Sequence, residues 1–244
     1  YFANSWGAMA AIRWADRVGK GVRTAPRDAL VADSIEEKQR GLAFGFHRAA
    51  DTLGAVMGLG VAALVVWLTQ RSSGLLTAGT FRFIVLLSLV PALLAVISLI
   101  VGSKDVSAES KHSLPRISFK TLGKDFTIFI LIVSLFDIGN SSDAFLALRA
   151  QERGVSVLGI LVMLIVFNLV YTLISTPAGI LSDRVGRKKI IIGGWFIYAL
   201  VYLGFGLAQQ DWHIYVFYII YGIYYGLTYG TIKAMVADIV PVEL

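Results

Sequence analysis

The sequence predicts an all-α fold, a polytopic bundle of about seven membrane-spanning helices. Three observations predict it. Hydrophobic residues make up 57% of the chain and gather in long runs, and a run of about 20 helical residues crosses a bilayer. Short charged segments separate these runs, as expected because charges are costly in hydrocarbon. Lysines and arginines gather in alternate segments, which the positive-inside rule places in the cytoplasm.

The first predicted span, residues 6–33, carries a stripe of cations that recur every three or four residues on one helix face. A spanning helix turns such a face toward a water-filled cavity or toward neighbouring helices. The alternative is that the span ends near Trp14 and that residues 15–40 form a cytoplasmic loop. The stripe consists of Arg13, Arg17, Lys20, Arg23 and Arg27.

The second predicted span, residues 41–69, carries three polar residues that meet on one side of a helix. His47 and Asp51 are one turn apart, and Arg48 and Asp51 are three residues apart. Small residues also repeat at every fourth position, which predicts a packing face. These are Ala50, Gly54, Gly58 and Ala62.

The next two predicted spans differ sharply in polarity. Residues 81–101 are almost purely apolar, with Pro91 near the middle, and we expect them to face lipid. Residues 126–148 have a polar centre with Asp137, Asn140 and Asp143. Two carboxylates near the middle of the bilayer are costly, and functional by default. The alternative is that Asp143 pairs with a basic residue of a neighbouring helix and only holds the bundle together.

Three further spans are predicted at residues 157–181, 190–208 and 214–237. The first carries Asn168 on a polar face. The last carries a glycine seam, predicted to pack against another helix, beside a stripe of tyrosines. Tyr221 and Tyr225 of that stripe either pack between helices or face a cavity. The seam consists of Gly222, Gly226 and Gly230.

A charged turn joins the spans 157–181 and 190–208. Its sequence is Gly179-Ile-Leu-Ser-Asp-Arg-Val-Gly-Arg-Lys-Lys189. A lysine and arginine cluster alone is typical of any cytoplasmic loop. The spaced glycines and the aspartate do not follow from that rule, so they indicate a more specific role. The residues singled out are Gly179, Asp183, Arg184, Gly186, Arg187 and Lys188.

The pattern G-x-x-x-D-R-x-G-R-K-K of this turn resembles the signature loop of the major facilitator superfamily, a large family of secondary transporters. The string from Asp16 to Leu30, D-R-V-G-K-G-V-R-T-A-P-R-D-A-L, resembles the fourth helix of a bacterial and archaeal branch of the same family. The sequence around His47–Asp51 resembles the fifth helix of that branch, and the sequence around Asp137–Asp143 resembles its seventh helix.

The resemblance implies a piece of a longer, twelve-helix transporter, covering helices four to ten. It divides the chain into the end of a first half (1–101), a cytoplasmic linker (102–124) and part of a second half (125–244). It implies that the two halves rock about a central site, with the charged turn as a cytoplasmic latch. It also implies a multi-pass protein of the cell membrane, which we expect to be monomeric.

Two candidate roles follow for the polar residues inside the predicted spans. Asp51 with His47, and secondly Asp137, are candidates to couple transport to protons or another ion. The remaining candidates line the substrate cavity. They are the stripe Arg13, Arg17, Lys20, Arg23 and Arg27, with Arg48, Asn140, Asp143, Asn168, Tyr221 and Tyr225.

The cargo and the function class stay open at this point. The basic stripe favours export of an organic anion, whereas Asp137 and Asp143 would suit a cationic drug. A receptor or scaffold subunit on the same fold is the other class. No enzyme motif, nucleic-acid-binding motif or phosphate-binding loop is found, and the three histidines lack metal-ligand spacing. We therefore expect no enzyme activity, no cofactor, no metal and no nucleic acid, and an ion gradient as the energy source.

Overall fold

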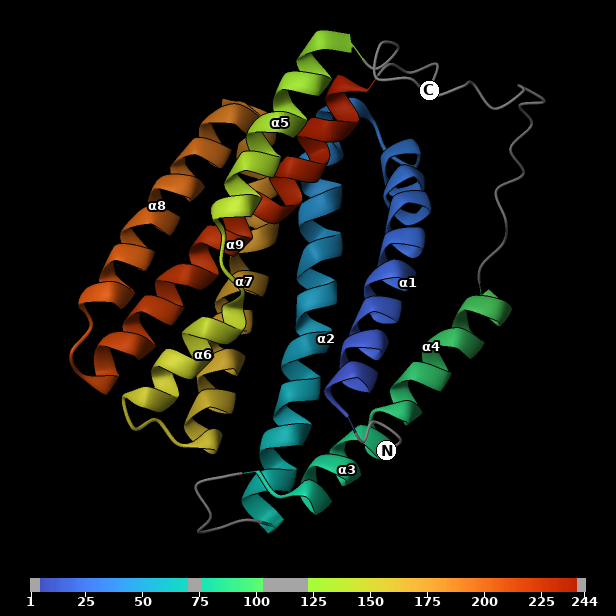
Figure 1. Ribbon diagram of the computed structural model, residues 1–244. Helices are drawn as coiled ribbons and strands as arrows, with labels where there is room; N and C mark the ends of the chain where they lie inside the picture. The colour runs from blue at the N-terminus through green and yellow to red at the C-terminus, as the bar shows by residue number, and fades with distance from the viewer. Residues whose placement is uncertain (1–4, 70–75, 103–122, 241–244) are drawn as a thin grey trace. The chain divides into compact units, whose positions relative to one another are not determined.

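The computed structural model describes residues 5–69, 76–102 and 123–240, and every regular element in these ranges is a helix (Figure 1). The elements are α1 (Trp6–Asp33), the short 3-10 turn η1 (Glu37–Gln39), α2 (Arg40–Thr69), α3 (Ala78–Leu87), α4 (Leu89–Gly102), α5 (Gly123–Gly139), α6 (Asp143–Glu152), α7 (Val157–Val185), α8 (Arg187–Leu207) and α9 (Asp211–Ile239).

Five helical segments of the described chain are long and apolar enough to cross a membrane, which confirms the all-α membrane fold. The other two predicted spans correspond to α1 and α9, which have 28 and 29 residues. Both are long enough to span but contain more polar residues. The five segments are Glu37–Thr69, Ala78–Gly102, Gly123–Glu152, Val157–Val185 and Arg187–Leu207.

The charged first span is one continuous helix. The Ser5 side chain accepts a hydrogen bond from the Ala8 N–H at 3.2 Å and caps the start of α1, which runs to Asp33. The alternative in which residues 15–40 form a loop is therefore wrong. Only the turn around η1 separates α1 from α2.

Two spans that were predicted as continuous are broken. Residues 126–148 form parts of α5 and α6, separated at 140–142, where Gly139 ends one helix and Ser142 caps the next. Residues 81–101 form parts of α3 and α4, separated at Ser88. Pro91 has no N–H to donate to the carbonyl of Leu87, the last residue of α3, so the helix is interrupted there.

The chain forms two compact units. The first contains Tyr1–Val56 and Met163–Asp238, and the second contains Met57–Val162 and Ile239–Leu244. The division passes through α2 and α7. The first unit holds α1, the beginning of α2, most of α7, α8 and nearly all of α9.

The predicted glycine seam of α9 is confirmed within the first unit. A Cβ added at Gly222 would lie 2.7 Å from the Phe167 carbonyl oxygen of α7, and one at Gly226 would lie 2.7 Å from Ile174. Figure 1 shows α9 crossing α7 at this contact. A Cβ at either position would therefore prevent the two helices from approaching so closely.

The predicted small-residue face of α2 has no such partner. A Cβ added at Gly54 or at Gly58 would meet nothing within 4 Å among the described residues. This face of α2 is therefore not a packing seam in the described part of the chain. Most of the predicted linker 102–124, and residues 70–75 of the loop after α2, lie outside the described residues.

Candidate functional site

The turn between α7 and α8 is built on a single glycine. α7 ends at Val185 and α8 begins at Arg187, and Gly186 between them has a φ of +98°. Residues with a side chain rarely adopt this backbone conformation. The turn brings Asp183 and Arg187 together, with Arg187 Nη1 2.7 Å from Asp183 Oδ1. Both side chains are nearly buried, so this pair is better shielded from water than a surface salt bridge.

The Asp183 carboxylate also caps the start of α2. Its Oδ1 accepts a hydrogen bond from the Gly41 N–H and its Oδ2 accepts one from the Leu42 N–H, both at 2.9 Å. The first N–H groups of any helix lack partners within that helix, and its N-terminus attracts negative charge. Asp183 therefore does for α2 what a local capping residue does elsewhere, from a helix about 140 residues away in sequence.

Glycines on both helices make this contact possible. A Cβ added at Gly41 would lie 2.5 Å from Asp183 Oδ1 and 2.5 Å from the Gly179 carbonyl oxygen. A Cβ added at Gly179 would collide with the Gly41 backbone. One turn further along α2, a Cβ at Gly45 would lie 2.5 Å from the Ser175 carbonyl oxygen. The start of α2 thus lies directly against the end of α7.

The end of α9 closes the same cluster of charges. Asp238 accepts a hydrogen bond from Arg187 Nε and pairs with Arg40, whose Nη1 lies 3.3 Å from Asp238 Oδ1. Arg40 also donates to the Ala237 carbonyl oxygen at 2.8 Å. We call this group of charges and backbone atoms the latch. It consists of Arg40, Gly41, Leu42, Asp183, Arg187 and Asp238.

A second group of charges links α1 to α9. The Lys233 ammonium lies 2.7 Å from Asp28 Oδ2. The Arg27 guanidinium donates to the other oxygen of the same carboxylate, Asp28 Oδ1, from Nε at 3.2 Å and from Nη2 at 3.1 Å. One carboxylate is thus shared by two cations, and all three side chains are more than two-thirds buried.

A neighbouring group surrounds Arg48 of α2. Its Nη1 lies 3.0 Å from Asp51 Oδ2, and its Nε donates to the Tyr171 hydroxyl of α7. The guanidinium carbon lies 5.0 Å from the centre of the Tyr171 ring and 5.1 Å from that of the Tyr229 ring of α9. Cations at this distance from an aromatic face are attracted to it. Arg48 is therefore held by an ion pair, a hydrogen bond and two rings.

His47 precedes Arg48 and lies one helical turn before Asp51 on α2, and Arg48 contacts Tyr229 one turn before Lys233 on α9, so the two groups adjoin. We call the combined set the inner cluster. Arg48 follows Gly41 by seven residues of helix, so the inner cluster lies about 10 Å from the latch along α2. Its members are Arg27, Asp28, His47, Arg48, Asp51, Tyr171, Tyr229 and Lys233.

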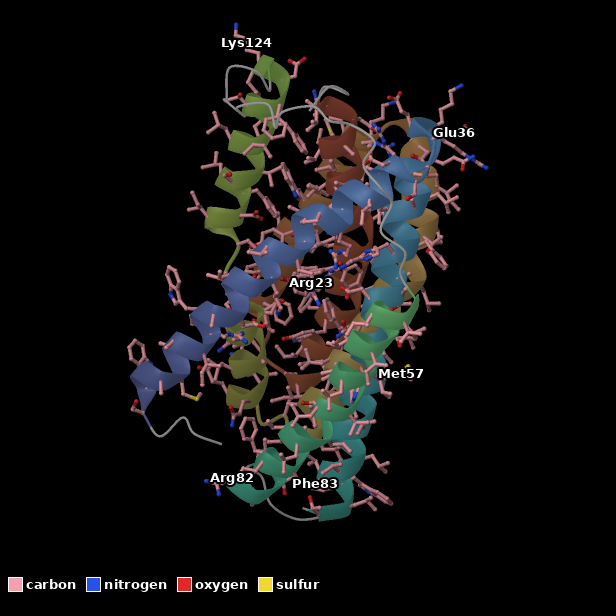
Figure 2. All side chains as sticks on the ribbon, turned by 90° about the vertical axis from the view of Figure 1, so that its right-hand side faces the viewer. Arg23, Glu36, Met57, Arg82, Phe83 and Lys124 are labelled. Carbon is pink, nitrogen blue, oxygen red and sulfur yellow. The ribbon has the colours of Figure 1, made fainter. Side chains whose placement is uncertain are left out.

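The rest of the predicted basic stripe does not join the inner cluster. Lys20 pairs with Asp16 of its own helix at 3.3 Å. Arg13, Arg17 and Arg23 are exposed and make no ion pair or hydrogen bond among the described residues. Figure 2 shows Arg23 about midway along α1. Three cations of the stripe thus stay exposed along this helix.

Three other residues that were predicted to line the substrate cavity lie in the first unit and contact its own helices. Asn168 donates to the Leu164 carbonyl oxygen of its own helix at 2.8 Å. Tyr221 is fully buried and Tyr225 is 7% exposed. The centre of the Phe167 ring lies 5.6 Å and 5.1 Å from those of the two tyrosine rings. This favours the packing alternative for the tyrosines, and we do not include them in the site proposed below.

The remaining candidates lie in the second unit, at the break between α5 and α6. The carbonyl oxygen of Asp137 accepts a hydrogen bond from the Asn140 N–H at 3.2 Å, and Asp143 is the first residue of α6. Both aspartates are exposed. A broken helix exposes backbone groups that can bind ions in transporters. The role of these residues stays a prediction.

The sequence did not point to several members of the two groups. Arg40, Gly41 and Leu42 read as the ordinary start of a helix, although a glycine there, with no local capping side chain, is a weak signal of close approach. Asp238 and Lys233 were visible only as polar residues at the end of a span. Tyr171 carried no signal at all, because its partner Arg48 is distant in sequence.

Comparison with known proteins assigns a family to this arrangement. The family model described as Major Facilitator Superfamily matches residues 1–244. A curated protein of Methanocaldococcus jannaschii, described as an uncharacterised MFS-type transporter, is 34% identical over 243 residues. The alignment covers 97% of this chain and 59% of that protein, so the chain spans less than two-thirds of its relative. No solved structure matches the chain.

Proposed function

The chain belongs to the major facilitator superfamily, and from this premise we propose that the protein is a secondary active transporter. It would move a small solute across the cell membrane by alternating access, with proton-coupled export as its direction and energy source. The family is one of transporters and not of enzymes. The chain is a multi-pass membrane protein, so the bilayer surrounds its apolar helices.

One observation carries the proposal, namely the capping of α2 by Asp183. In the proposed division into halves, α1 and α2 belong to the first half and α7 to α9 belong to the second. The latch then joins the two halves at the end of the bundle that carries the positive loop charge, which the positive-inside rule assigns to the cytoplasm. The latch as described would correspond to a transporter closed on its cytoplasmic side.

The chemistry of the latch suits a contact that opens and closes. Hydrogen bonds to charged groups contribute about 1.5–3 kcal/mol each, and water replaces them when the groups separate. Asp183 and Arg187 are paired within one turn and stay paired on opening. The capping bonds to Gly41 and Leu42, and the bonds of Arg187 to Asp238, are the ones that must break.

Proton coupling is assigned to Asp51, with His47 beside it. Asp51 is half-exposed and pairs with Arg48, which also contacts Tyr171 of α7 and Tyr229 of α9, so a movement of α2 against α7 and α9 would alter this ion pair. The charged and titratable groups around this position come from three other helices and from α2 itself. They are Arg27 and Asp28 of α1, His47 and Arg48 of α2, Tyr171 of α7, and Tyr229 and Lys233 of α9.

The latch is tested by distance measurement on the full-length protein. Spin labels at Lys38 and Lys188, both exposed, would report the separation of the starts of α2 and α8. We expect Asp183→Asn to shift the distribution toward longer distances and Asp16→Asn to leave it unchanged. A single distribution that no variant alters would favour a receptor or scaffold and would contradict the proposal.

Coupling and direction are tested by flux. The protein is reconstituted in vesicles so that all copies face the same way. A pH gradient should then drive the solute to the side of the membrane that corresponds to the outside of the cell. Asp51→Asn should abolish the response to the gradient while the protein remains folded. If gradient-driven transport survived that change, the assignment of Asp51 would fail, and Asp137→Asn would be the next variant to test.

A further inference from the structure

We propose that the inner cluster binds the acidic group of a small organic monoanion, which would make the cargo an organic acid. This inference rests on the proposed transport function and adds the class of cargo. It starts from the charges of the cluster. Three cations face two carboxylates, so with His47 neutral the cluster has one net positive charge. The cations are Arg27, Arg48 and Lys233, and the carboxylates are Asp28 and Asp51.

The uncompensated charge lies where it is costly. The side chains of Arg27, Arg48 and Lys233 are 29%, 26% and 25% exposed, and Arg48 lies on α2, which is long and apolar enough to cross a membrane. A net positive charge in such a place is disfavoured, because hydrocarbon and protein solvate it poorly. An anion that completes the cluster would remove this cost, and its binding would therefore be favourable.

The three cations lie close enough to act on one bound group. Arg27 and Lys233 bind the two oxygens of the same Asp28 carboxylate, and Arg48 lies over the ring of Tyr229, one helical turn before Lys233 on α9. Each cation already has one fixed partner, Asp28 or Asp51, which holds it in place. A guanidinium offers five N–H donors, so Arg48 keeps donors for a carboxylate or sulfonate after it binds Asp51 and Tyr171.

Access to Arg48 is open on the side of Asp51. The Asp51 side chain is 50% exposed. At Gly54, one turn further along the same face of α2, no atom of the described ranges lies within 4 Å of where a Cβ would be. Along α1, the exposed Arg13, Arg17 and Arg23 have no anionic partner among the described residues. Their charge would attract an anion toward the cluster.

The charge count also limits the cargo. One bound monoanion brings the net charge of the cluster to zero. A dianion would make the net charge negative, and a cation would make it more positive. The structure therefore favours a single carboxylate or a similar group over a phosphate dianion, and it disfavours a cationic drug at this position.

The test uses the full-length protein in detergent and measures the midpoint of its thermal unfolding in the presence of each of four probes. Benzenesulfonate stays a monoanion at any working pH, benzenesulfonamide is its neutral near-isostere, benzyltrimethylammonium has the opposite charge, and inorganic phosphate tests the dianion. A ligand that binds only the folded state raises the midpoint as its concentration grows. We expect benzenesulfonate alone to raise it.

Variants then test whether the cluster is responsible. Arg48→Gln removes the uncompensated charge and should weaken benzenesulfonate binding by about 10- to 100-fold. Asp51→Asn adds a second uncompensated charge and should strengthen binding. The double variant Arg48→Gln, Asp51→Asn restores the native count and should recover much of the affinity that Arg48→Gln loses.

Arg149→Gln is the matched control. Arg149 pairs with Glu152 three residues later at 3.1 Å, as Arg48 pairs with Asp51 at 3.0 Å, but on α6. This variant should bind benzenesulfonate as the native protein does.

Several results would overturn the inference. These are stabilisation by benzyltrimethylammonium or phosphate but not by benzenesulfonate, stabilisation that Arg48→Gln leaves intact, a double variant that recovers nothing, or no stabilisation by any probe. The spin-label distances separate this failure from that of the transport function. If Asp183→Asn lengthens them and no anion binds, the transporter proposal stands and the cargo class falls. If they never change, the transport function fails whatever binds.

Discussion

The sequence Asp-Arg-Val-Gly followed by a basic residue occurs twice in this chain and adopts two different conformations. Asp16-Arg-Val-Gly-Lys20 lies inside α1, whereas Asp183-Arg-Val-Gly-Arg187 ends α7 and begins α8. Both copies form an ion pair between the first and fifth residues. In α1 the pair is at 3.3 Å and largely exposed, and in the turn it is at 2.7 Å and nearly buried.

The difference between the copies comes from tertiary partners. In the turn, Asp183 receives two N–H groups of α2, and Gly186 takes a positive φ that redirects the chain. In α1, Asp16 pairs with Lys20 of the same helix, and Gly19 continues the helix with no atom of the described residues within 4 Å of where a Cβ would lie. The pattern thus permits a turn, and the contact with α2 is what distinguishes the copy that forms one.

The largest effect should come from adding a methyl group at the contact. Gly179→Ala would place a Cβ against the Gly41 backbone, and overpacking of this kind costs about 1–3 kcal/mol or more. We expect a lower thermal midpoint and longer distances between labels at Lys38 and Lys188. Gly19→Ala is the control from the other copy. Equal behaviour of the two variants would show that α2 and α7 are not in contact in the protein.

The next largest effect should come from the capping carboxylate. Asp183→Asn weakens two charged hydrogen bonds to α2 and the pair with Arg187, and we expect it to cost about 2–3 kcal/mol. Asp16→Asn weakens only one exposed pair within α1, which contributes about 0.3–0.5 kcal/mol. Thermal unfolding of both variants measures the difference. A loss at Asp16 as large as that at Asp183 would contradict the comparison.

The glycines of the two copies should respond with opposite signs. Gly186→Ala forces a side chain into a positive φ and should destabilise the protein by about 1–3 kcal/mol. Gly19→Ala removes a glycine from a helix interior without a clash and should stabilise it by up to about 1 kcal/mol. Their thermal midpoints should move in opposite directions. A shift of the same sign would mean that α1 also turns at Gly19.

The smallest effect should come from replacing the cation of each ion pair by the other basic residue, Arg187 by lysine and Lys20 by arginine. Arg187→Lys keeps the charge but loses the planar group that reaches Asp183, Ser182 and Asp238 together, and should cost about 1 kcal/mol. Lys20→Arg should change stability by less than about 0.5 kcal/mol, since its partner is exposed. The midpoints of both variants, measured at low and high salt, check this order.

The fold could be predicted from the sequence further than the site could. Hydrophobic runs and the charge stripe of α1 depend on helix period and length, which are local, so the helices and the α9 seam were predicted. The break at residues 140–142 was not predicted, because a polar centre fits both a cavity-facing helix and a broken one. The break at Ser88 was not predicted, because a proline in an apolar run also fits a kinked but continuous helix. Asp183 and Arg48 were singled out by motif, but their partners Gly41 and Tyr171 are more than 100 residues away and no local pattern connects them.

The capping of α2 by Asp183 also has a consequence for the role of water. When the latch is open, the N–H groups of Gly41 and Leu42, the Asp183 carboxylate and the charges of Arg40 and Asp238 must be hydrated, whereas in the closed latch they satisfy one another. Opening therefore takes up water molecules. Osmolytes that are excluded from protein surfaces lower the activity of water and favour the less hydrated form. The equilibrium between the open and closed latch should thus shift toward the closed form as osmotic pressure rises.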